Sequence, residues 1–343
     1  MNHFVKDISI KNFKSIQNIE IKDCSRINIF IGEPNVGKSN ILEALSIVGL
    51  PYNYLDNPAY LNECVRPHEN IDLFYNGNLD KKLSIRAWDE NNSGIGFDNT
   101  DNLSFIFSIG KEGSAIHLGR FSFNGKKEHK DFPIFIEKIK NDLIFPIKKY
   151  HFLHNLSHTN GLSSTLTPPF GKNLPTILAQ NKPLMKEIQE FFVKYGQKLV
   201  LDRNDNSLRM LKSVDTDDSF VFLLPYSSVA DSLQRLIFYK AAVASNENAI
   251  LLFEEPEAHT FPPYISKLTY DIIQSTTNQF FITTHSPVIV NDFLENAQAD
   301  LSVFIVDFKN NQTVVHKLTA EEIHRVYQYG IDLFYNYENF VGA

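Results

Sequence analysis

Apolar and polar positions change their period along this 343-residue chain. Two alternating segments within residues 4–31 predict a β-hairpin at the start of a sheet. Residues 71–125 contain further strand-like segments separated by Asn/Gly turns, as in an antiparallel sheet. Leu184–Tyr195 carries apolar residues at helical spacing and predicts an amphipathic helix. Residues 4–31 and 71–125 are therefore expected to contain strands, and Leu184–Tyr195 a helix.

From about residue 225, helical patterns alternate with short apolar runs. Asn310-Asn311 predicts a turn into a last edge strand, Val314–Leu318, and Ala320–Tyr337 is expected to be a helical tail. Such alternation indicates an α/β sheet. The expected helices are Ser232–Ala244, Pro263–Gln274 and Val288–Leu294, and the expected strands are Ala249–Phe253, Gln279–Thr283 and Leu301–Val306.

One motif fits a phosphate-binding loop at every fixed position: Gly32-Glu33-Pro34-Asn35-Val36-Gly37-Lys38-Ser39 matches G-x-x-x-x-G-K-[ST]. The strand-like run Arg26–Ile31 precedes it, and Ser39–Val48 follows with apolar residues on one helical face. A strand that enters such a loop and opens a helix presents free N–H groups and the positive helix end to an anion. Lys38 would meet the β- and γ-phosphates, and the Ser39 hydroxyl would hold Mg²⁺.

The composition is that of an ordinary globular protein, with 43% hydrophobic residues and a formal net charge of -7. A nucleic-acid contact would therefore need a local basic patch. The two cysteines, Cys24 and Cys64, are expected to be reduced thiols of a cytosolic protein. The first residues lack the layout of a signal peptide, and no apolar run is long enough to span a bilayer. We expect a soluble, cytoplasmic protein.

A second constellation follows the apolar strand at 249–253. It ends in two carboxylates, Glu254 and Glu255, which resemble a Walker B element. Because side chains alternate along a strand, Glu254 is expected on the Mg²⁺ side and Glu255 as the base that deprotonates the attacking water. His285 ends the next strand and is expected to sense the γ-phosphate. Taken alone, the acids would be solvated at the end of a buried strand, and the histidine would be structural.

Together these motifs resemble the ABC-type ATPases of the SMC, RecF and OLD group, and most of all the compact OLD-like AAA ATPases of bacterial anti-phage operons. The resemblance implies an α/β P-loop NTPase of ABC type, with a mixed central sheet, flanking helices and an antiparallel β lobe. One ATPase would span residues 1–343, with the nucleotide-binding core in 1–50 and 196–343 and an inserted lobe and helical connector in 51–195. The matching segments are Asn12–Ile16, Gly32–Asn40, Leu252–His259 and Thr283–Pro287.

The resemblance also assigns binding residues outside the loop. In the family, a serine and a glycine at a signature helix bind the γ-phosphate held by a second subunit; here Ser227 and Ser228 occupy that place, and Val229 replaces the glycine. This replacement predicts a weaker or altered contact, and an ordinary helix cap is the alternative for the two serines. Lys14 matches a basic residue that reaches the nucleotide in relatives, or else is a solvated lysine. The expected nucleotide contacts are Gly32, Glu33, Pro34, Asn35, Val36, Gly37, Lys38, Ser39, Asn40, Lys14, Ser227 and Ser228.

The first functional hypothesis is a slow ATPase that uses ATP and Mg²⁺, dimerises around the nucleotide and regulates an effector in anti-phage defence. OLD-like relatives often carry a Toprim nuclease; the chain ends soon after the core, so a separately encoded nuclease or toxin is expected. The alternatives are a RecF-like DNA-binding repair ATPase and a non-hydrolysing, ATP-dependent assembly scaffold. DNA is a partner only in the RecF-like case, and no membrane is expected. The small basic clusters Lys126–Lys130 and Lys148-Lys149 are expected to be solvated, with a DNA-contact patch as the alternative.

Overall fold

The computed structural model describes residues 4–341 except 54–56, 58, 66–68, 102–103, 112–115, 122–145, 160, 162, 203–204, 206 and 214–220. The basic cluster Lys126–Lys130 lies outside the described residues. The chain divides into two compact units. Unit 1 comprises Met1–Lys149, Asn248–Glu255 and Thr276–Ala343, and unit 2 comprises Tyr150–Glu247 and Pro256–Ser275. The boundaries of these units differ from those of the predicted core, 1–50 and 196–343, and the predicted insert, 51–195.

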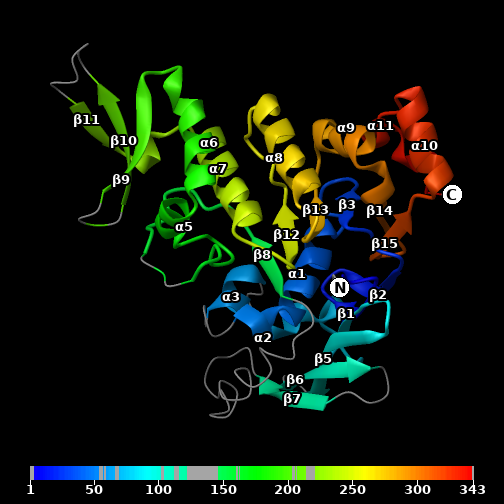
Figure 1. The fold of residues 1–343 in the computed structure, drawn as a ribbon. Helices are drawn as coiled ribbons and strands as arrows, with labels where there is room; N and C mark the ends of the chain where they lie inside the picture. Colours follow the sequence, from blue (N-terminus) through cyan, green and yellow to red (C-terminus); the bar gives the residue numbers. More distant parts are fainter. Residues whose placement is uncertain are drawn as a thin grey trace. The chain divides into compact units, whose positions relative to one another are not determined.

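Unit 1 contains a six-stranded mixed sheet that carries the phosphate-binding loop (Figure 1). Four neighbouring strands run parallel, and β15 closes one edge antiparallel to β14. The central strands are almost fully buried, as expected for parallel strands covered on both faces. The order across the sheet is β15 (Gln312–Lys317), β14 (Leu301–Lys309), β3 (Ile27–Ile31), β13 (Gln279–Thr283), β12 (Ile250–Glu254) and β8 (Ile147–Tyr150).

A second, antiparallel sheet in unit 1 begins with the predicted hairpin at the N-terminus. Strand β4, which follows the hairpin much later in the chain, pairs with β1 and extends the hairpin into a six-stranded sheet. Helix α1 (Lys38–Val48) contacts both sheets, and its apolar residues belong to the same buried cluster as theirs. The strands in order are β2 (Ile16–Ile21), β1 (Asp7–Phe13), β4 (Ser84–Trp88), β5 (Ser93–Asp101), β6 (Ser104–Lys111) and β7 (Ile116–Phe121).

The remaining helices of unit 1 are mostly short. The predicted helical tail is interrupted, because α10 ends at Gly330, which takes a left-handed backbone with φ 60°. Asn310 and Asn311 also have positive φ and form the predicted turn between β14 and β15. Among the described residues, no helix combines the length and apolarity needed to cross a membrane. The helices are α2 (Leu50–Asn53), α3 (Tyr60–Cys64), α9 (Pro287–Asn296), α10 (Ala320–Tyr329) and α11 (Leu333–Asn336).

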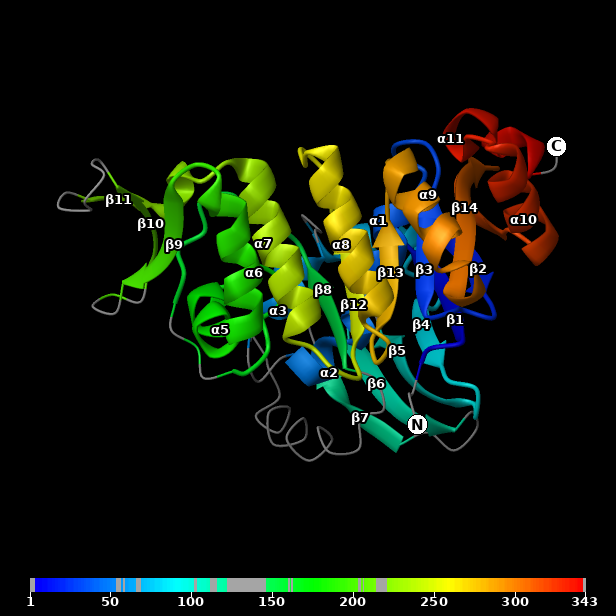
Figure 2. The same cartoon turned by 45° about the horizontal axis from the view of Figure 1, so that its top comes forward.

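Unit 2 combines four helices with a small antiparallel sheet, and Figure 2 shows α6, α7 and α8 side by side. The sheet has the order β11-β10-β9. Lys240 of α7 is buried and pairs with Asp271 of α8 at 2.5 Å and Glu187 of α6 at 2.7 Å, so one cation joins three helices. The elements are α5 (Leu174–Gln180), α6 (Lys182–Val193), β9 (Gln197–Asp202), β10 (Ser207–Ser213), β11 (Val221–Pro225), α7 (Asp231–Ala244) and α8 (Pro262–Gln274).

These elements confirm the predicted fold class: a mixed central sheet with flanking helices, accompanied by antiparallel β structure. The helices and strands predicted between residues 225 and 318 all occur, and their ends differ from the predicted ones by at most three residues.

Candidate active site

The phosphate-binding loop joins β3 to α1, and Lys38 is the first residue of the helix. The Lys38 side chain folds back over its own loop, and its ammonium donates hydrogen bonds to the carbonyl oxygens of Gly32 at 3.0 Å and Glu33 at 2.7 Å. Lys38 is 5% exposed. The ammonium is therefore held at the centre of the loop, where a bound phosphate would replace neutral carbonyl partners with anionic ones.

Two glycines let this loop pack against its neighbours without a side chain. A Cβ on Gly32 would lie 2.1 Å from the carbonyl oxygen of Val306, and one on Gly37 would lie 2.2 Å from Oγ1 of Thr313. Their φ angles, +146° and +104°, are also ones that residues with a Cβ rarely adopt. The pattern G-x-x-x-x-G is therefore required here by packing as well as by backbone conformation.

A chain of side-chain hydrogen bonds supports the loop from below. The Asn40 amide donates to the Ser15 hydroxyl at 2.6 Å, and the Thr313 hydroxyl donates to the carbonyl oxygen of Val36 at 2.8 Å. The hydroxyl oxygens of Ser15 and Thr313 are 2.6 Å apart. Because the single hydroxyl proton of Thr313 is already donated to Val36, Ser15 must be the donor in this bond. Asn40, predicted to contact the nucleotide, thus uses its amide to hold the loop onto the β1–β2 turn.

Thr313→Val is expected to destabilise unit 1 by about 1–3 kcal/mol, because the Val36 carbonyl loses its hydrogen-bond donor and the Ser15 O–H loses its acceptor. Nucleotide affinity should fall as well, since Val36 and Gly37 lose their support. Urea unfolding measures the first effect and calorimetric titration with ATP the second. Thr277→Val, at a partly buried turn residue, is the matched control. Equal stability of the two variants would contradict the assigned support.

The two carboxylates at the end of β12 have different surroundings. The Glu254 carboxylate lies 3.1 Å from the ammonium of Lys149, and the two side chains are 9% and 2% exposed. Lys149 also donates to the carbonyl oxygen of Cys64 at 3.2 Å. The expectation that Lys148-Lys149 is a solvated cluster is wrong: both lysines are buried in β8. Glu254 therefore already has a cationic partner within the protein.

Glu255 projects from a strained backbone, with φ 44°, immediately after the strand. Its N–H donates to the carbonyl oxygen of Thr283 at 3.0 Å, which fixes it to the end of β13. The Glu255 carboxylate lies 3.4 Å from Nε2 of His285, and both side chains are partly exposed. The two predicted groups thus face each other at the carboxyl ends of adjacent parallel strands.

His285 is held in its neutral form. Burial lowers its pKa, the nearby charge of Lys38 lowers it further, and Glu255 acts in the opposite direction. Glu255 contacts the imidazole directly, and Lys38 is close enough for its charge to act on it. The structure brings these three predicted residues together, while their catalytic roles stay predictions.

Acidification should reduce the stability of unit 1 partly through His285. Because its folded pKa lies below the ordinary value of about 6.5, the unfolded chain binds more protons between the two values, and stability falls as pH drops below about 6.5. The decrease in urea midpoint between pH 7.5 and 5.5 should be smaller in His285→Asn than in the wild type. The exposed His324 supplies the control variant, His324→Asn, which should retain the wild-type decrease.

The serines of the predicted signature segment, Ser227 and Ser228, do not cap the helix that follows them. Tyr226–Ser228 forms a single 3₁₀ turn, and α7 begins only at Asp231, with Ala230 at the N-cap position and no side-chain cap. The alternative of an ordinary helix cap for Ser227 and Ser228 is therefore wrong. Both serines are exposed.

Val229, in the place of the family's glycine, has an ordinary extended backbone with φ -70°. Its N–H donates to the carbonyl oxygen of Tyr226, and its own carbonyl oxygen accepts from the Gln234 amide at 2.6 Å. The backbone N–H of Val229 is thus engaged within the turn, and it is not offered to a phosphate as the family's glycine N–H would be.

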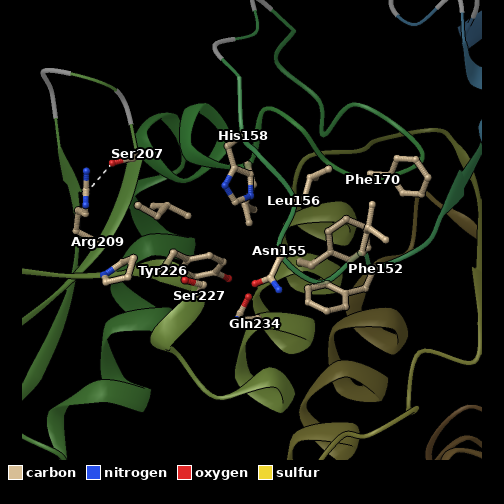
Figure 3. Close-up of a pocket in the computed structure, with 15 residues that line it drawn as sticks. Phe152, Asn155, Leu156, His158, Phe170, Ser207, Arg209, Tyr226, Ser227 and Gln234 are labelled. Carbon is tan, nitrogen blue, oxygen red and sulfur yellow. Dashed lines mark hydrogen bonds between the residues drawn. The ribbon is translucent and has the colours of Figure 1, made fainter.

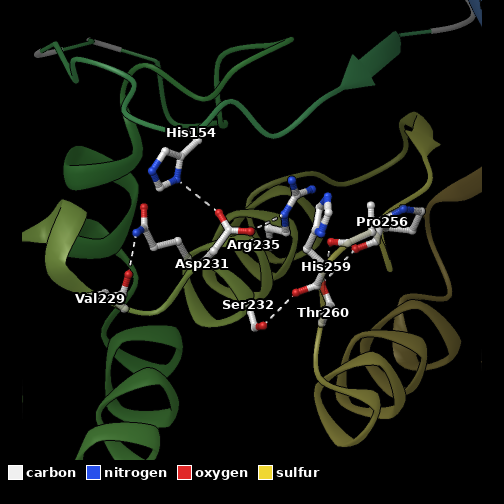
Figure 4. Close-up of polar contacts among 10 residues, drawn as sticks. His154, Val229, Asp231, Ser232, Arg235, Pro256, His259 and Thr260 are labelled. Atoms are coloured by element: carbon white, nitrogen blue, oxygen red, sulfur yellow. Dashed lines mark hydrogen bonds and ion pairs between the residues drawn. The ribbon is translucent and has the colours of Figure 1, made fainter.

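Polar contacts connect this helix start to the loop after β12 within unit 2 (Figure 4). The Ser232 hydroxyl donates to the carbonyl oxygen of His259 at 2.8 Å. Asp231 accepts from Arg235 at 3.0 Å and lies 3.2 Å from Nδ1 of His154. A displacement of the loop at 256–260 would therefore be transmitted to the first turn of α7.

Comparison with known proteins agrees with this arrangement. Residues 27–291 match the family described as "AAA domain, putative AbiEii toxin, Type IV TA system". The chain belongs to this AAA domain family. An "ATP/GTP phosphatase" of Helicobacter pylori is 24% identical over 98% of both chains. RecF of a Thermoanaerobacter species is 25% identical and RecF of Clostridium perfringens 22%; the AAA chain spans 65% and 53% of their lengths.

The fold of this AAA protein is that of SMC heads. An SMC head bound to the C-terminal winged-helix domain of ScpA superposes with a TM-score of 0.60 at 16% identity, over 93% of this chain and 99% of the other. The SMC head with an extended coiled coil, bound to the C-terminal domain of ScpA from Pyrococcus furiosus, gives 0.56 at 14% identity, over 95% and 99%. The AAA protein therefore shares the SMC-head fold, and its phosphate-binding loop joins β3 to α1.

The residues of the AAA domain suit magnesium bound together with a nucleotide. Among the described residues, no group of three or more His, Cys, Asp or Glu side chains is arranged to hold a metal ion alone. Mg²⁺ usually needs no such cage, because phosphate oxygens and water supply most of its ligands. Ser39, partly exposed in the first turn of α1, and Glu254 offer hard oxygen donors of the required kind. Their metal-binding roles stay predictions.

Other predicted contacts of the AAA domain have partners inside unit 1. The Lys14 ammonium pairs with Glu43 of α1, and Glu33 accepts a hydrogen bond from the Tyr337 hydroxyl at 3.0 Å. This hydrogen bond raises the pKa of Tyr337 to about 12. Glu33, Pro34 and Asn35 are exposed at the rim of the loop.

Four residues with evident positional roles were not among the predicted site residues. Thr313 and Ser15 support the loop, Lys149 pairs with Glu254, and Ser232 contacts the loop after β12. The apolar neighbours of Lys149 were the only local signal, because a lysine next to a strand's apolar residues can extend into the core. The other three are recognisable only from contacts between segments distant in sequence.

Proposed function

We propose that this AAA protein binds ATP with magnesium, hydrolyses it slowly and uses the cycle to associate with a second copy of itself and to control a separate effector. The observation that carries the proposal is the group formed by Lys38, Glu255 and His285. A loop that cradles phosphate, a carboxylate that accepts a proton and an imidazole beside it are the parts that ATP hydrolysis requires.

In the proposed reaction, Lys38 exchanges its contacts with the Gly32 and Glu33 carbonyls for oxygens of the β- and γ-phosphates. Glu255 accepts a proton from water as the water oxygen bonds to the γ-phosphorus and the bond to the β–γ bridging oxygen breaks. His285 orients Glu255 and the γ-phosphate through its ring nitrogens. Magnesium, held by Ser39 and Glu254, would neutralise phosphate charge. The products are ADP and inorganic phosphate.

Association with a second copy is proposed from the signature turn. Ser227 and Ser228 are exposed on the turn, so their hydroxyls are accessible to a phosphate held by another subunit. Binding would be weaker than through a glycine-containing signature, because the N–H of Val229 is already used. ATP would therefore hold two subunits together only as long as the γ-phosphate remains.

The effector is proposed to be a nuclease or toxin that acts in anti-phage defence. The description of the matched family, a putative AbiEii toxin of a type IV toxin–antitoxin system, supports a role in such a system. The SMC heads bound to ScpA support a partner protein in more general terms, since this fold accommodates one. Hydrolysis after a trigger would release or activate the effector.

Purified wild-type protein should release phosphate from ATP slowly and should shift from monomer to dimer in light scattering when ATP and Mg²⁺ are added. Lys38→Ala should do neither, because the loop loses its central charge. Retention of both properties by Lys38→Ala would refute the assignment of the site. Hydrolysis without association would refute only the proposed dimer.

The RecF relatives favour a second candidate, a DNA-dependent ATPase. The charge pattern gives it little support in unit 1, because basic residues on the face of β1, β2 and β4 have acidic neighbours: Lys22 pairs with Glu20, and Lys82 and Arg86 with Asp98. Turnover that rises with added DNA and falls steeply with salt would favour the RecF-like function over the effector-coupled one.

A further inference from the structure

Unit 2 contains a cavity of about 350 Å³ that the candidate active site does not use (Figure 3). Its walls come from the segment after β8, the start of α5, the first residues of β10, the signature turn and α7. The inner wall is buried: Phe238 is 2% exposed and Gln234 3%, while Asn155 lies at an exposed part of the wall. Cavities that bind small molecules in proteins begin at about 300 Å³, so a ligand of modest size fits.

A buried hydroxyl in this wall has no partner. Tyr226 is 9% exposed, and its hydroxyl makes no hydrogen bond with any described residue. Burial raises the pKa of this phenol, so it remains protonated and able to donate. Figure 3 shows the Tyr226 hydroxyl pointing to the centre of the cavity, toward Asn155 and Gln234. A buried polar group without a partner is costly, which is why it indicates a missing ligand.

The other polar groups of the cavity add both donors and acceptors. Burial lowers the pKa of His158, whose ring packs against Tyr226 with centroids 5.8 Å apart, so the imidazole is neutral and offers one donor and one acceptor. The side-chain amide of Gln234 donates to Val229, which orients it, and Asn155 presents a second amide. The hydrogen-bonding edge of the ligand must therefore contain both donors and acceptors.

The charge and the aromatic surface of the lining limit which class of ligand the cavity can accept. Among the described residues that line the cavity, Arg209 alone has a permanent charge, and it donates to Asp205 at 2.9 Å and to Ser207 at 2.9 Å. Hydrogen bonds from Ser207, followed by Arg209, lower the pKa of Asp205 to about 2, so this pair stays ionised. Phe152 and Phe238 contribute aromatic surface, with ring centroids 5.8 Å apart. The buried wall of the cavity is therefore uncharged and rich in aromatic surface.

We propose that this cavity binds a nucleoside through its base. A nucleobase is a neutral, flat ring with donors and acceptors on one edge, and aromatic side chains provide surfaces on which bases pack. Tyr226 donates to the base, and the amides and His158 contact its remaining polar atoms. This second site is separate from the phosphate-binding loop, because all its lining residues belong to unit 2 and the loop belongs to unit 1.

The position of Tyr226 gives the site a consequence. Tyr226 begins the turn that contains Ser227 and Ser228, so a bound nucleoside would order the residues proposed to contact ATP across the dimer. ATP turnover should then change with nucleoside concentration. That consequence rests on the proposed function, whereas binding of the nucleoside itself does not.

The test is calorimetric titration of adenosine, guanosine, cytidine and uridine into the full chain carrying Lys38→Ala, which disables the loop. At least one nucleoside should bind with one-to-one stoichiometry. Adding Tyr226→Phe should weaken binding about tenfold, since one buried hydrogen bond is lost, without lowering stability. Adding Leu156→Trp should abolish binding by filling the cavity. Tyr335→Phe, at an 88% exposed tyrosine, is the matched control and should leave affinity unchanged.

The proposal is overturned if none of the four nucleosides binds at millimolar concentration, or if Tyr226→Phe binds as tightly as its parent. Binding by the wild type that disappears with Lys38→Ala alone would also overturn it, because the nucleoside would then occupy the loop. Should Leu156→Trp fail to fold, Tyr226→Phe and Tyr335→Phe still decide the question. Intact nucleoside binding together with absent ATP turnover would refute the proposed function and leave this site standing.

Discussion

Glu255→Gln is expected to lower the rate of ATP hydrolysis by about 10²–10⁴-fold while ATP still binds. The amide has the size and shape of the carboxylate but cannot accept a proton at neutral pH, so only the proposed chemical step is lost. The strained backbone at Glu255 should be retained, because its N–H bond to Thr283 does not involve the side chain. Phosphate release measures the rate, and titration with ATP measures the binding.

The matched control for this experiment is Glu295→Gln, at an exposed carboxylate of α9 in the same unit. It should hydrolyse ATP at the wild-type rate. A Glu255→Gln protein that also hydrolyses at that rate would show that another group accepts the proton. A variant that neither binds nor hydrolyses ATP would instead indicate that Glu255 helps to form the binding site.

The phosphate-binding loop was predictable because its determinants are local. Strand, glycines, lysine and helix lie within about 25 consecutive residues, and each residue type has a direct physical reason at its position. The alternation after residue 225 likewise predicted the parallel strands, since buried strands of five residues read as continuous apolar runs. Both predictions depended on neighbours in the sequence and on nothing distant.

Contacts between distant segments were not predictable. Thr313 supports Val36 from 277 positions away, and nothing in the local pattern of β15 distinguishes it from other threonines of an edge strand. In the signature segment, residue type alone was misleading. Ser227 and Ser228 are of the type that caps helices, but α7 begins only at Asp231, three residues after Ser228. Residue type indicates which contacts a side chain can make, and the tertiary structure decides which of them form.

The pairing of Lys149 with Glu254 has a consequence for how the strand-end acids are used. The two neighbouring carboxylates have different environments. Glu254 pairs with a buried cation, whereas Glu255 lies beside a neutral imidazole and is partly exposed. A carboxylate with a fixed ammonium partner is a poor proton acceptor, because accepting a proton would leave the ammonium unpaired. This difference supports the proposal that Glu255, rather than Glu254, is the base.

Lys149→Met is expected to destabilise unit 1 by about 3–5 kcal/mol, because it removes the cationic partner of a buried carboxylate, that of Glu254. Methionine retains most of the length and apolar surface of the lysine, so the loss would come from charge rather than from a cavity. The free energy of unfolding in urea measures the effect. Lys22→Met is the control: Lys22 pairs with Glu20 at 3.2 Å, but both side chains are more than half exposed, and the change should cost at most about 1 kcal/mol.

The double variant Lys149→Met/Glu254→Gln separates the pair from the rest of the protein. With both charges gone, part of the lost stability should be recovered. The sum of the stability losses in the two single variants should therefore exceed the loss in the double variant. Strict additivity would contradict a direct interaction between the two side chains. Magnesium adds a second readout, because Mg²⁺ bound with ATP brings positive charge to Glu254 and should stabilise Lys149→Met more than the wild type. Equal stabilisation of both proteins by Mg²⁺ and ATP would place the metal away from Glu254.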